Sequence, residues 1–362
     1  MKTATQLVSQ PVAMPPYDIV RAAYAELRVT DLAASERFYV DLLGMIVTDR
    51  TADALYLRGW EERLHHSLVL RPGPVPGAAR LGFRVRRERD LDLLADQLAS
   101  QGLTVAWAQG ADPGIGRVLR TWDPFGYPLE FFHEMQQLET QLQRFDLHRG
   151  APILRFDHFN LHTPRLEAAF RFWTGLGFRC SEYISTDGPD ERITGAWLLR
   201  KPSVHDVALT AGRGPRLHHT AFWVGEPAGI LRACDQLAAA GEARAIERGP
   251  GRHGVSNAFY LYILDPDGHR VEIYTQDYWT GDPDNPLITW DVHDNQRRDW
   301  WGNPVVPSWY TEASLVLDLD GNPVPVVART DASEMAVTVG ADGFSYTREG
   351  DTERGFKLGN QL

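Results

Sequence analysis

The chain has 362 residues, a formal net charge of −11, 43% hydrophobic residues and two cysteines. The acidic balance argues against nucleic acid or an anionic membrane as a partner, and no apolar run approaches the roughly 20 residues of a membrane span. Two cysteines make no disulfide scaffold, so we expect a cytoplasmic protein. The length is sufficient for two domains and a tail.

The first half alternates strands with short helices. A strand is predicted over 20–31, where apolar residues alternate with polar ones. A helix over 31–43 follows, with Asp31 as its N-cap and Gly44 at its end. The further strands are predicted at 54–57, 67–70, 81–85, 116–123 and 128–132, with a second helix at 90–101.

The second half repeats this order. Its strands are predicted at 157–162, 195–199, 205–210, 218–224, 258–264 and 271–275, and its helices at 166–176 and 229–240. The glycine-rich stretch 247–254 is predicted to be a flexible loop. The order strand, helix and three strands therefore occurs four times. This indicates an α+β protein of four βαβββ modules in two tandem paired-module domains.

The predicted domains are 17–136 and 152–276, joined by a polar segment. A C-terminal extension, 277–362, contains several tryptophans that need a surface to pack on. We expect it to lie over the second domain or a neighbouring subunit, and to end from about residue 331 in a lid or a mobile tail.

Aligning the halves shows where they differ in chemistry. His158, His219 and Glu272 lie in the second half at the positions that Tyr24, Arg80 and Glu130 occupy in the first. Two imidazoles and one carboxylate form the facial triad of a non-haem Fe(II) site. Mn(II) accepts the same ligands, and zinc is not excluded by them. The first half lacks this set, because a guanidinium has no lone pair to offer.

The doublet of His218 and His219 requires a choice between two neighbouring histidines. Adjacent strand residues face opposite sides, so only one of them can point at the metal. Aligning Phe83 with Phe222 places His219 opposite Arg80, which favours His219 as the ligand.

Further polar residues are predicted to surround the metal. His205 is a third imidazole, either a ligand, a structural donor or a general acid/base. Tyr260 and Tyr262 share a strand face, where one hydroxyl can reach a metal-bound oxygen or both can pack in the sheet. A group of basic residues indicates recognition of a small carboxylate, unless they form surface ion pairs: Arg248, Arg252, His253, Arg297 and Arg298.

Three segments carry a family resemblance: Asp157-His-Phe-Asn160, Leu217-His-His-Thr-Ala-Phe222, and the stretch from Asn257 to Glu272. They resemble the type I extradiol ring-cleaving dioxygenases of the vicinal oxygen chelate superfamily. The stretches 247–278, 282–286 and 290–301 are similar to its homoprotocatechuate (3,4-dihydroxyphenylacetate) 2,3-dioxygenase group. The resemblance runs from about residue 17 to about residue 330.

This resemblance implies metal-dependent cleavage of a catechol by O2 in aromatic catabolism, with 5-carboxymethyl-2-hydroxymuconate semialdehyde as the product. It implies one Fe(II) per subunit, or Mn(II), held by His158, His219 and Glu272, and a homotetramer. It implies that His205 is the acid/base and that Tyr262 binds a substrate oxygen. The residues that it assigns to the substrate or oxygen pocket are Asn160, Trp197, Arg248, His253 and Arg297.

The sequence leaves three alternatives open. One is an extradiol dioxygenase for a related carboxylated catechol. Another is a metal-dependent isomerase or lyase on the same fold, which would turn over without O2. The third is a non-catalytic binding protein.

Overall fold

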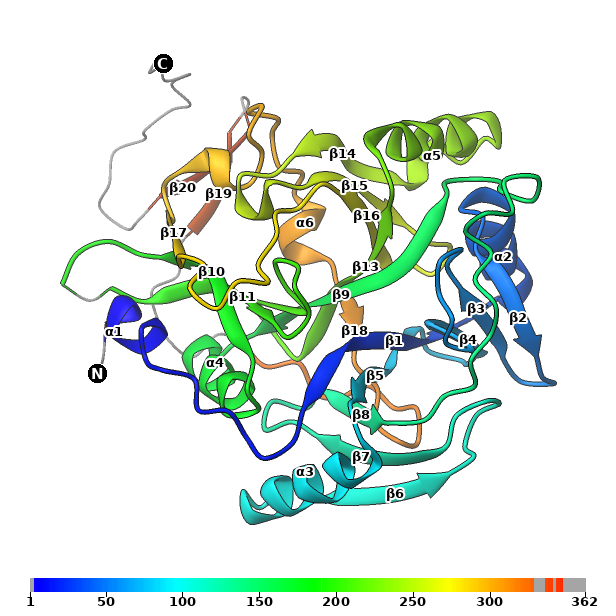
Figure 1. The fold of residues 1–362 in the computed structure, drawn as a ribbon. Helices are drawn as coiled ribbons and strands as arrows, with labels where there is room; N and C mark the ends of the chain where they lie inside the picture. The colour runs from blue at the N-terminus through cyan, green and yellow to red at the C-terminus, as the bar shows by residue number, and fades with distance from the viewer. Residues whose placement is uncertain (1–2, 190, 329–335, 341–342, 348–362) are drawn as a thin grey trace.

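The computed structural model describes residues 3–189, 191–328, 336–340 and 343–347. Each half of the chain forms one large curved sheet with helices packed against it (Figure 1). The α+β fold with two tandem domains, predicted from the repeats, is confirmed. Within the described residues, no helix is long and apolar enough to cross a membrane.

The first sheet has eight strands in the order β2-β3-β4-β1-β5-β8-β7-β6. Its strands are β1 (Ile19–Val29), β2 (Ile46–Arg50), β3 (Leu55–Arg58), β4 (Leu68–Pro72), β5 (Gly77–Val85), β6 (Val105–Gln109), β7 (Arg117–Trp122) and β8 (Pro128–Phe132). The central pair β1 and β5 is antiparallel, and a parallel strand flanks each, β4 beside β1 and β8 beside β5. Helix α3 (Glu88–Ser100) covers β6 and β7 with its buried leucines.

The second sheet repeats this topology around β9 and β13 and adds strands from the C-terminal extension. Its strands are β9 (Ile153–Thr163), β10 (Arg179–Ser185), β11 (Ile193–Leu199), β12 (Val207–Ala211), β13 (Arg216–Val224), β14 (Ile246–Arg252), β15 (Phe259–Leu264), β16 (Arg270–Thr275), β17 (Ile288–Asp291) and β18 (Ser314–Leu315). Its helices are α4 (Leu166–Gly175) and α5 (Pro227–Ala239). Short helical turns are α1 (Ala4–Val8), η2 (Ala243–Ala245), η3 (Val255–Asn257), η4 (Asn295–Arg297) and α6 (Ser308–Thr311).

Strand register confirms the alignment of the two halves residue by residue. In the first sheet Tyr24 pairs with Gly82, which pairs with Glu130. In the second sheet His158 pairs with Ala221, which pairs with Glu272. The two sets therefore occupy the same three strands at the same level of each sheet.

The two halves dock through their matching Asp-Pro-X-Gly turns. After the first turn, the Tyr127 hydroxyl donates to the backbone carbonyl of His162. After the second, His269 Nε2 donates to the backbone carbonyl of Arg28 at 2.9 Å. Each turn thus holds the central strand of the other half, and one hydrophobic core continues through both.

Several element boundaries differ from the predictions. The helix predicted over 31–43 is α2 (Leu32–Glu36) followed by a π-helix, η1 (Arg37–Leu42). Strands β2, β6, β10 and β17 were not predicted. In β2, β10 and β17 polar residues break the apolar alternation, and β6 is a partly exposed edge strand without alternation.

The stretch predicted as a flexible loop, 247–254, is mostly strand β14, paired antiparallel with β15. Its glycines serve close packing rather than mobility. A Cβ at Gly251 would lie 2.4 Å from Asp299 Oδ2 and 2.7 Å from the Tyr260 hydroxyl. Gly249 has a φ of +98°, which side chains rarely adopt.

The described part of the C-terminal extension adds strands to the second sheet, which is one of the two placements expected from the sequence. Strand β17 adds to the sheet edge parallel to β10, and β18 pairs with β13. The predicted lid or mobile tail from residue 331 lies outside the described residues, apart from the hairpin of β19 (Ala336–Gly340) and β20 (Gly343–Thr347).

Candidate metal centre

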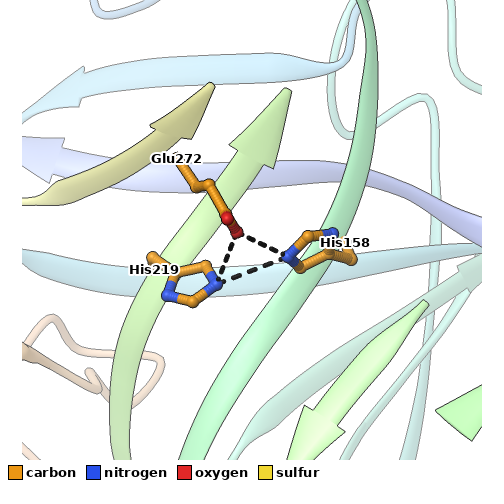
Figure 2. Close-up of side chains that lie close together, drawn as sticks. All are labelled: His158, His219 and Glu272. Atoms are coloured by element: carbon orange, nitrogen blue, oxygen red, sulfur yellow. Dashed lines mark hydrogen bonds and ion pairs between the residues drawn. The ribbon is translucent and has the colours of Figure 1, made fainter. Parts of the chain in front are cut away.

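Three neighbouring strands of the second sheet bring one ligand each to a common point. His158 lies on β9, His219 on β13 and Glu272 on β16, and Figure 2 shows the three side chains turned toward one another. His158 Nε2 lies 3.3 Å from His219 Nε2 and 3.1 Å from Glu272 Oε2. His219 Nε2 lies 3.2 Å from the same carboxylate oxygen, and all three residues are buried.

These separations fit three adjacent positions around one octahedral ion. Bonds of about 2.1 Å at right angles place donor atoms about 3.0 Å apart, and the observed distances differ from this by a few tenths of an ångström. Two neutral imidazoles and one carboxylate are the donor types of a divalent metal site. The three residues therefore form a metal-binding triad.

A buried charged network lies behind His158. Asp157 Oδ2 is 3.0 Å from His158 Nδ1 and accepts from the Tyr274 hydroxyl at 2.6 Å. Lys201 Nζ lies 3.5 Å from the same oxygen. Burial would raise the pKa of Asp157, but Lys201 and the hydrogen bond with His158 outweigh it and hold that pKa well below its ordinary value. An ionised carboxylate thus orients the ring of the first ligand.

The electrostatics of the triad favour an ionised carboxylate. Burial would raise the pKa of Glu272, but hydrogen bonds with His158, His219 and His253 hold it well below its ordinary value. Burial lowers the pKa of His219 to about 4, although Glu272 opposes the shift. A neutral imidazole and a charged carboxylate are the forms that bind a metal.

His219, rather than His218, joins the triad, as the alignment with Arg80 predicts, but the expectation that the two rings face opposite sides is wrong. The register between β9 and β13 shifts between Leu217 and His219, so a bulge replaces regular alternation there. The two rings lie side by side, with Nδ1 atoms 2.7 Å apart. His218 Nε2 lies 2.9 Å from the backbone carbonyl of Trp309.

His205 lies beside the triad without joining it. Its ring centroid is 3.8 Å from that of His158, and the side chain is buried. Its Nδ1 has no hydrogen-bond partner among the described residues. Burial, reinforced by His158, lowers the pKa of His205 well below its ordinary value. The ring is therefore a neutral imidazole beside the triad.

Of the two tyrosines on β15, only Tyr262 lines the cavity. Its hydroxyl lies 2.9 Å from His253 Nε2, which is itself 3.5 Å from Glu272 Oε1. Tyr260 stacks on the His253 ring at a centroid distance of 3.8 Å and donates to Asp299 at 2.5 Å. Tyr260 thus supports His253, and Tyr262 presents its hydroxyl to the cavity.

A cavity of about 460 Å³ opens over the triad. The predicted site residues that line it are Asn160, Trp197, His205, Arg248, His253, Tyr262 and Arg297, together with the triad. Arg298 also lines it. Arg252, which was considered with these basic residues, does not; it donates to the Asn257 carbonyl and to Gln276.

Two guanidinium groups in the cavity wall are held from the C-terminal extension. Arg248 donates to the Arg298 carbonyl at 2.8 Å and lies 4.5 Å from the Trp309 ring. Arg297 donates to the Val292 carbonyl at 2.6 Å. Sequence reasoning missed the lining residues Trp309 and Tyr310, because no motif links the extension to the metal strands. It also missed Tyr274, although this residue lies on β16 two positions after Glu272, where strand alternation places it on the same face.

A family model, described as the Glyoxalase/Bleomycin resistance protein/Dioxygenase superfamily, matches residues 21–131 and 155–273. The chain belongs to this superfamily. Each of the two matched ranges corresponds to one paired-module domain, so the doubling of the chain is a repeat of the superfamily domain.

Relatives within the superfamily are dioxygenases. A manganese-dependent 2,3-dihydroxybiphenyl 1,2-dioxygenase of Geobacillus genomosp. 3 is 32% identical over 79% of this chain and 95% of the relative. A metapyrocatechase of Geobacillus stearothermophilus is 30% identical over 83% of this chain and 95% of the relative.

Two solved structures are more similar still. A homoprotocatechuate 2,3-dioxygenase variant from B. fuscum has 53% identity and a TM-score of 0.87, covering 97% of this chain and 100% of that one. The enzyme from Arthrobacter globiformis has 54% identity and a TM-score of 0.84, covering 89% and 99%. The predicted enzyme class, an extradiol ring-cleaving dioxygenase, is thereby confirmed.

Proposed function

We propose that this dioxygenase cleaves 3,4-dihydroxyphenylacetate (homoprotocatechuate) beside its diol, giving 5-carboxymethyl-2-hydroxymuconate semialdehyde. The observation that carries the proposal is one cavity with a metal triad at one end and the guanidinium groups of Arg248 and Arg297 in its wall. A catechol with a short anionic arm matches both features. The similarity to homoprotocatechuate 2,3-dioxygenases agrees with this substrate.

The proposed cofactor is one Fe(II) per subunit, with Mn(II) as the alternative, held by His158, His219 and Glu272. When bound, the ion would stabilise the catecholate and hold it next to O2, which converts an encounter of two reactants into an oriented reaction. Both ions accept this donor set, and one relative is manganese-dependent.

The substrate arm is assigned to the basic wall of the cavity. Arg248 and Arg297 would pair with the carboxylate, and His253 would line the same wall beside them. Trp197 provides an aromatic surface for the ring. Because both guanidiniums are buried and already held by backbone carbonyls, they present a fixed charge to the substrate.

Proton transfer is assigned to His205, and substrate orientation to Tyr262 and Asn160. A neutral imidazole in the cavity accepts a proton from the diol and returns it during ring opening. The Tyr262 hydroxyl donates to a substrate oxygen. The Asn160 amide oxygen is engaged by Thr210 at 2.6 Å, which leaves its amide nitrogen to face the oxygen site.

We further propose that the enzyme is a cytoplasmic homotetramer. The cysteines Cys180 and Cys234 are both free, which fits a reducing compartment. The tetramer rests on the family resemblance, and light scattering of the purified protein tests it.

The test is an assay of metal-free protein reloaded separately with Fe(II), Mn(II) and Zn(II). Aerobic 3,4-dihydroxyphenylacetate should give the yellow semialdehyde with Fe(II) or Mn(II), and no product without O2. Protocatechuate, catechol and 2,3-dihydroxybiphenyl, tested alongside, should be turned over more slowly. Faster cleavage of one of them would reassign the substrate. Turnover without O2 would indicate an isomerase or lyase, and metal binding without turnover a non-catalytic protein.

A further inference from the structure

His218 lies in a chain of hydrogen bonds that ends at the metal triad. Its Nδ1 is 2.7 Å from His219 Nδ1, and its Nε2 is 2.9 Å from the backbone carbonyl oxygen of Trp309. Its exposed fraction is 1%, and that of His219 is 3%. At the far end, His219 Nε2 faces His158 and Glu272.

These contacts allow only one arrangement of protons when His219 binds a metal. The Trp309 carbonyl can only accept, so His218 Nε2 carries a proton and donates. A metal on His219 Nε2 requires the lone pair of that atom, so the proton of the neutral ring lies on His219 Nδ1. His218 Nδ1 must then accept that proton's hydrogen bond. The position of the proton on each ring nitrogen thus determines whether the next nitrogen donates or accepts.

We infer that His218 is a positioning residue for the metal ligand His219, and that the Trp309 carbonyl fixes the tautomer of both rings. The inference rests on the proposed metal site. The bulge in β13 is the local feature that makes it possible, because it puts both rings of the doublet on one side of the strand.

The two histidine ligands are therefore held in different ways. Asp157, an ionised carboxylate, supports His158, and a neutral imidazole supports His219. Outer partners of this kind set the ring orientation and basicity of a ligand, and losing one typically costs 10- to 100-fold in metal affinity.

The same contact connects the C-terminal extension to the metal. The Trp309 ring lies 4.3 Å from the ring of Tyr262 and 4.5 Å from the guanidinium of Arg248, while its carbonyl holds His218. One short helix, α6, thus shapes the cavity wall and orients a ligand.

The test compares two variants of His218. His218→Leu removes the acceptor and fills much of the space, whereas His218→Asn keeps an oxygen near the position of Nδ1. We expect about 10- to 100-fold weaker Mn(II) binding for the Leu variant, and binding close to wild type for the Asn variant. Competition against a fluorescent chelator gives these affinities without any turnover.

A control separates positioning from general damage. His269 is also buried and hydrogen-bonded at both ring nitrogens, to Ser314 and to the Arg28 carbonyl, but it touches no ligand. His269→Leu should lower the melting temperature of the metal-free protein yet leave the Mn(II) affinity unchanged. Equal Mn(II) affinities for His218→Leu and wild type would overturn the inference, and so would an equal loss in His269→Leu.

Two readouts report on the ligand itself. The absorption spectrum of the Co(II)-loaded protein should change in His218→Leu and return in His218→Asn. Neutron diffraction of the deuterium-exchanged, metal-loaded wild type should show deuterium on His218 Nε2 and on His219 Nδ1. Deuterium on His218 Nδ1 would overturn the inference even if no variant folds. Failure of the proposed function would show instead as wild-type protein that binds metal without cleaving catechols.

Discussion

The first half of the chain contains a complete counterpart of the metal centre, with ion pairs in place of a metal. Tyr24, Arg80 and Glu130 occupy the register positions of His158, His219 and Glu272. The Tyr24 hydroxyl donates to Glu130, and Arg80 Nε lies 3.9 Å from the same carboxylate. The glutamate is thus kept, and a fixed guanidinium supplies the positive charge that an ion would supply in the second half.

The correspondence extends beyond the triad. Counting along the paired strands, His66 matches His205, Tyr56 matches Trp197, and Arg120 matches Tyr262. Arg120 donates to Glu130 at 2.6 Å, and Asp112 accepts from Arg80 at 2.5 Å. Strand geometry therefore brings these positions together in both halves. The residue types at these positions determine whether a half holds a metal site or a buried network of ion pairs.

The largest expected effect comes from giving the second half a first-half residue. His219→Arg should abolish metal binding, because a guanidinium offers no lone pair and would pair with Glu272 as Arg80 does with Glu130. The loss should exceed the roughly 100-fold expected for an outer partner, with turnover at background. Elemental analysis after reloading checks this, and metal retained at the wild-type level would contradict the ligand assignment.

His205→Phe should separate binding from chemistry. We expect metal and catechol to bind as in the wild type, while turnover falls by about 10²- to 10⁴-fold because the acid/base is lost. His66→Phe, at the matching first-half position, is the control and should keep its turnover. Anaerobic substrate titration and steady-state oxygen uptake measure the two steps. Unchanged turnover in His205→Phe would remove this residue from the mechanism.

Removing the first-half carboxylate should affect stability and leave the chemistry alone. Glu130→Gln leaves Arg80 and Arg120 without their shared charge, and breaking a buried pair in this way costs about 3 kcal/mol or more. Urea unfolding should show this loss, while metal content and turnover stay at wild-type levels. A fall in metal content would mean that the first-half cluster takes part in metal binding after all.

The smallest expected effect is on pH dependence. Burial, reinforced by His65, lowers the pKa of His66 to about 3, against about 6.5 in an unfolded chain. Between these values only the unfolded chain binds the proton. The contribution of neutral His66 to the free energy of unfolding is therefore fully present above pH 6.5 and falls as the pH drops toward 3. Between pH 7 and pH 5 this contribution of His66 to the free energy of unfolding falls by about 2 kcal/mol. Unfolding measured at both pH values should show a correspondingly smaller difference for His66→Asn, and an equal difference would contradict this.

Much of the site was predictable because the sequence is doubled. Aligning the halves located His158, His219 and Glu272. The family resemblance supplied Tyr262 and Asn160, which line the same cavity. The family resemblance supplied the roles of Arg248 and Arg297.

The remaining features depend on packing that no local pattern encodes. The bulge beside His218 follows from strand pairing with β9, so the expectation that His218 and His219 face opposite sides was wrong, although the alignment with Arg80 selected His219. Strand β14 was predicted to be a loop because of its glycines. Gly251 is needed there because the side chains of Tyr260 and Asp299, which lie elsewhere in the chain, leave no room for a Cβ. Trp309 reaches the cavity from α6, far along the sequence from the metal strands.

An extradiol dioxygenase inserts both atoms of O2 into a catechol ring, and we assign this reaction to the second-half cleft. The most direct measurement is mass spectrometry of the product formed from 3,4-dihydroxyphenylacetate under ¹⁸O₂ by the Fe(II)- or Mn(II)-loaded enzyme. We expect a ring-opened semialdehyde that carries two labelled oxygens, after correction for exchange of the aldehyde oxygen with water. A product with no label, or with its ring intact, would contradict cleavage of the catechol by O2 in this cleft.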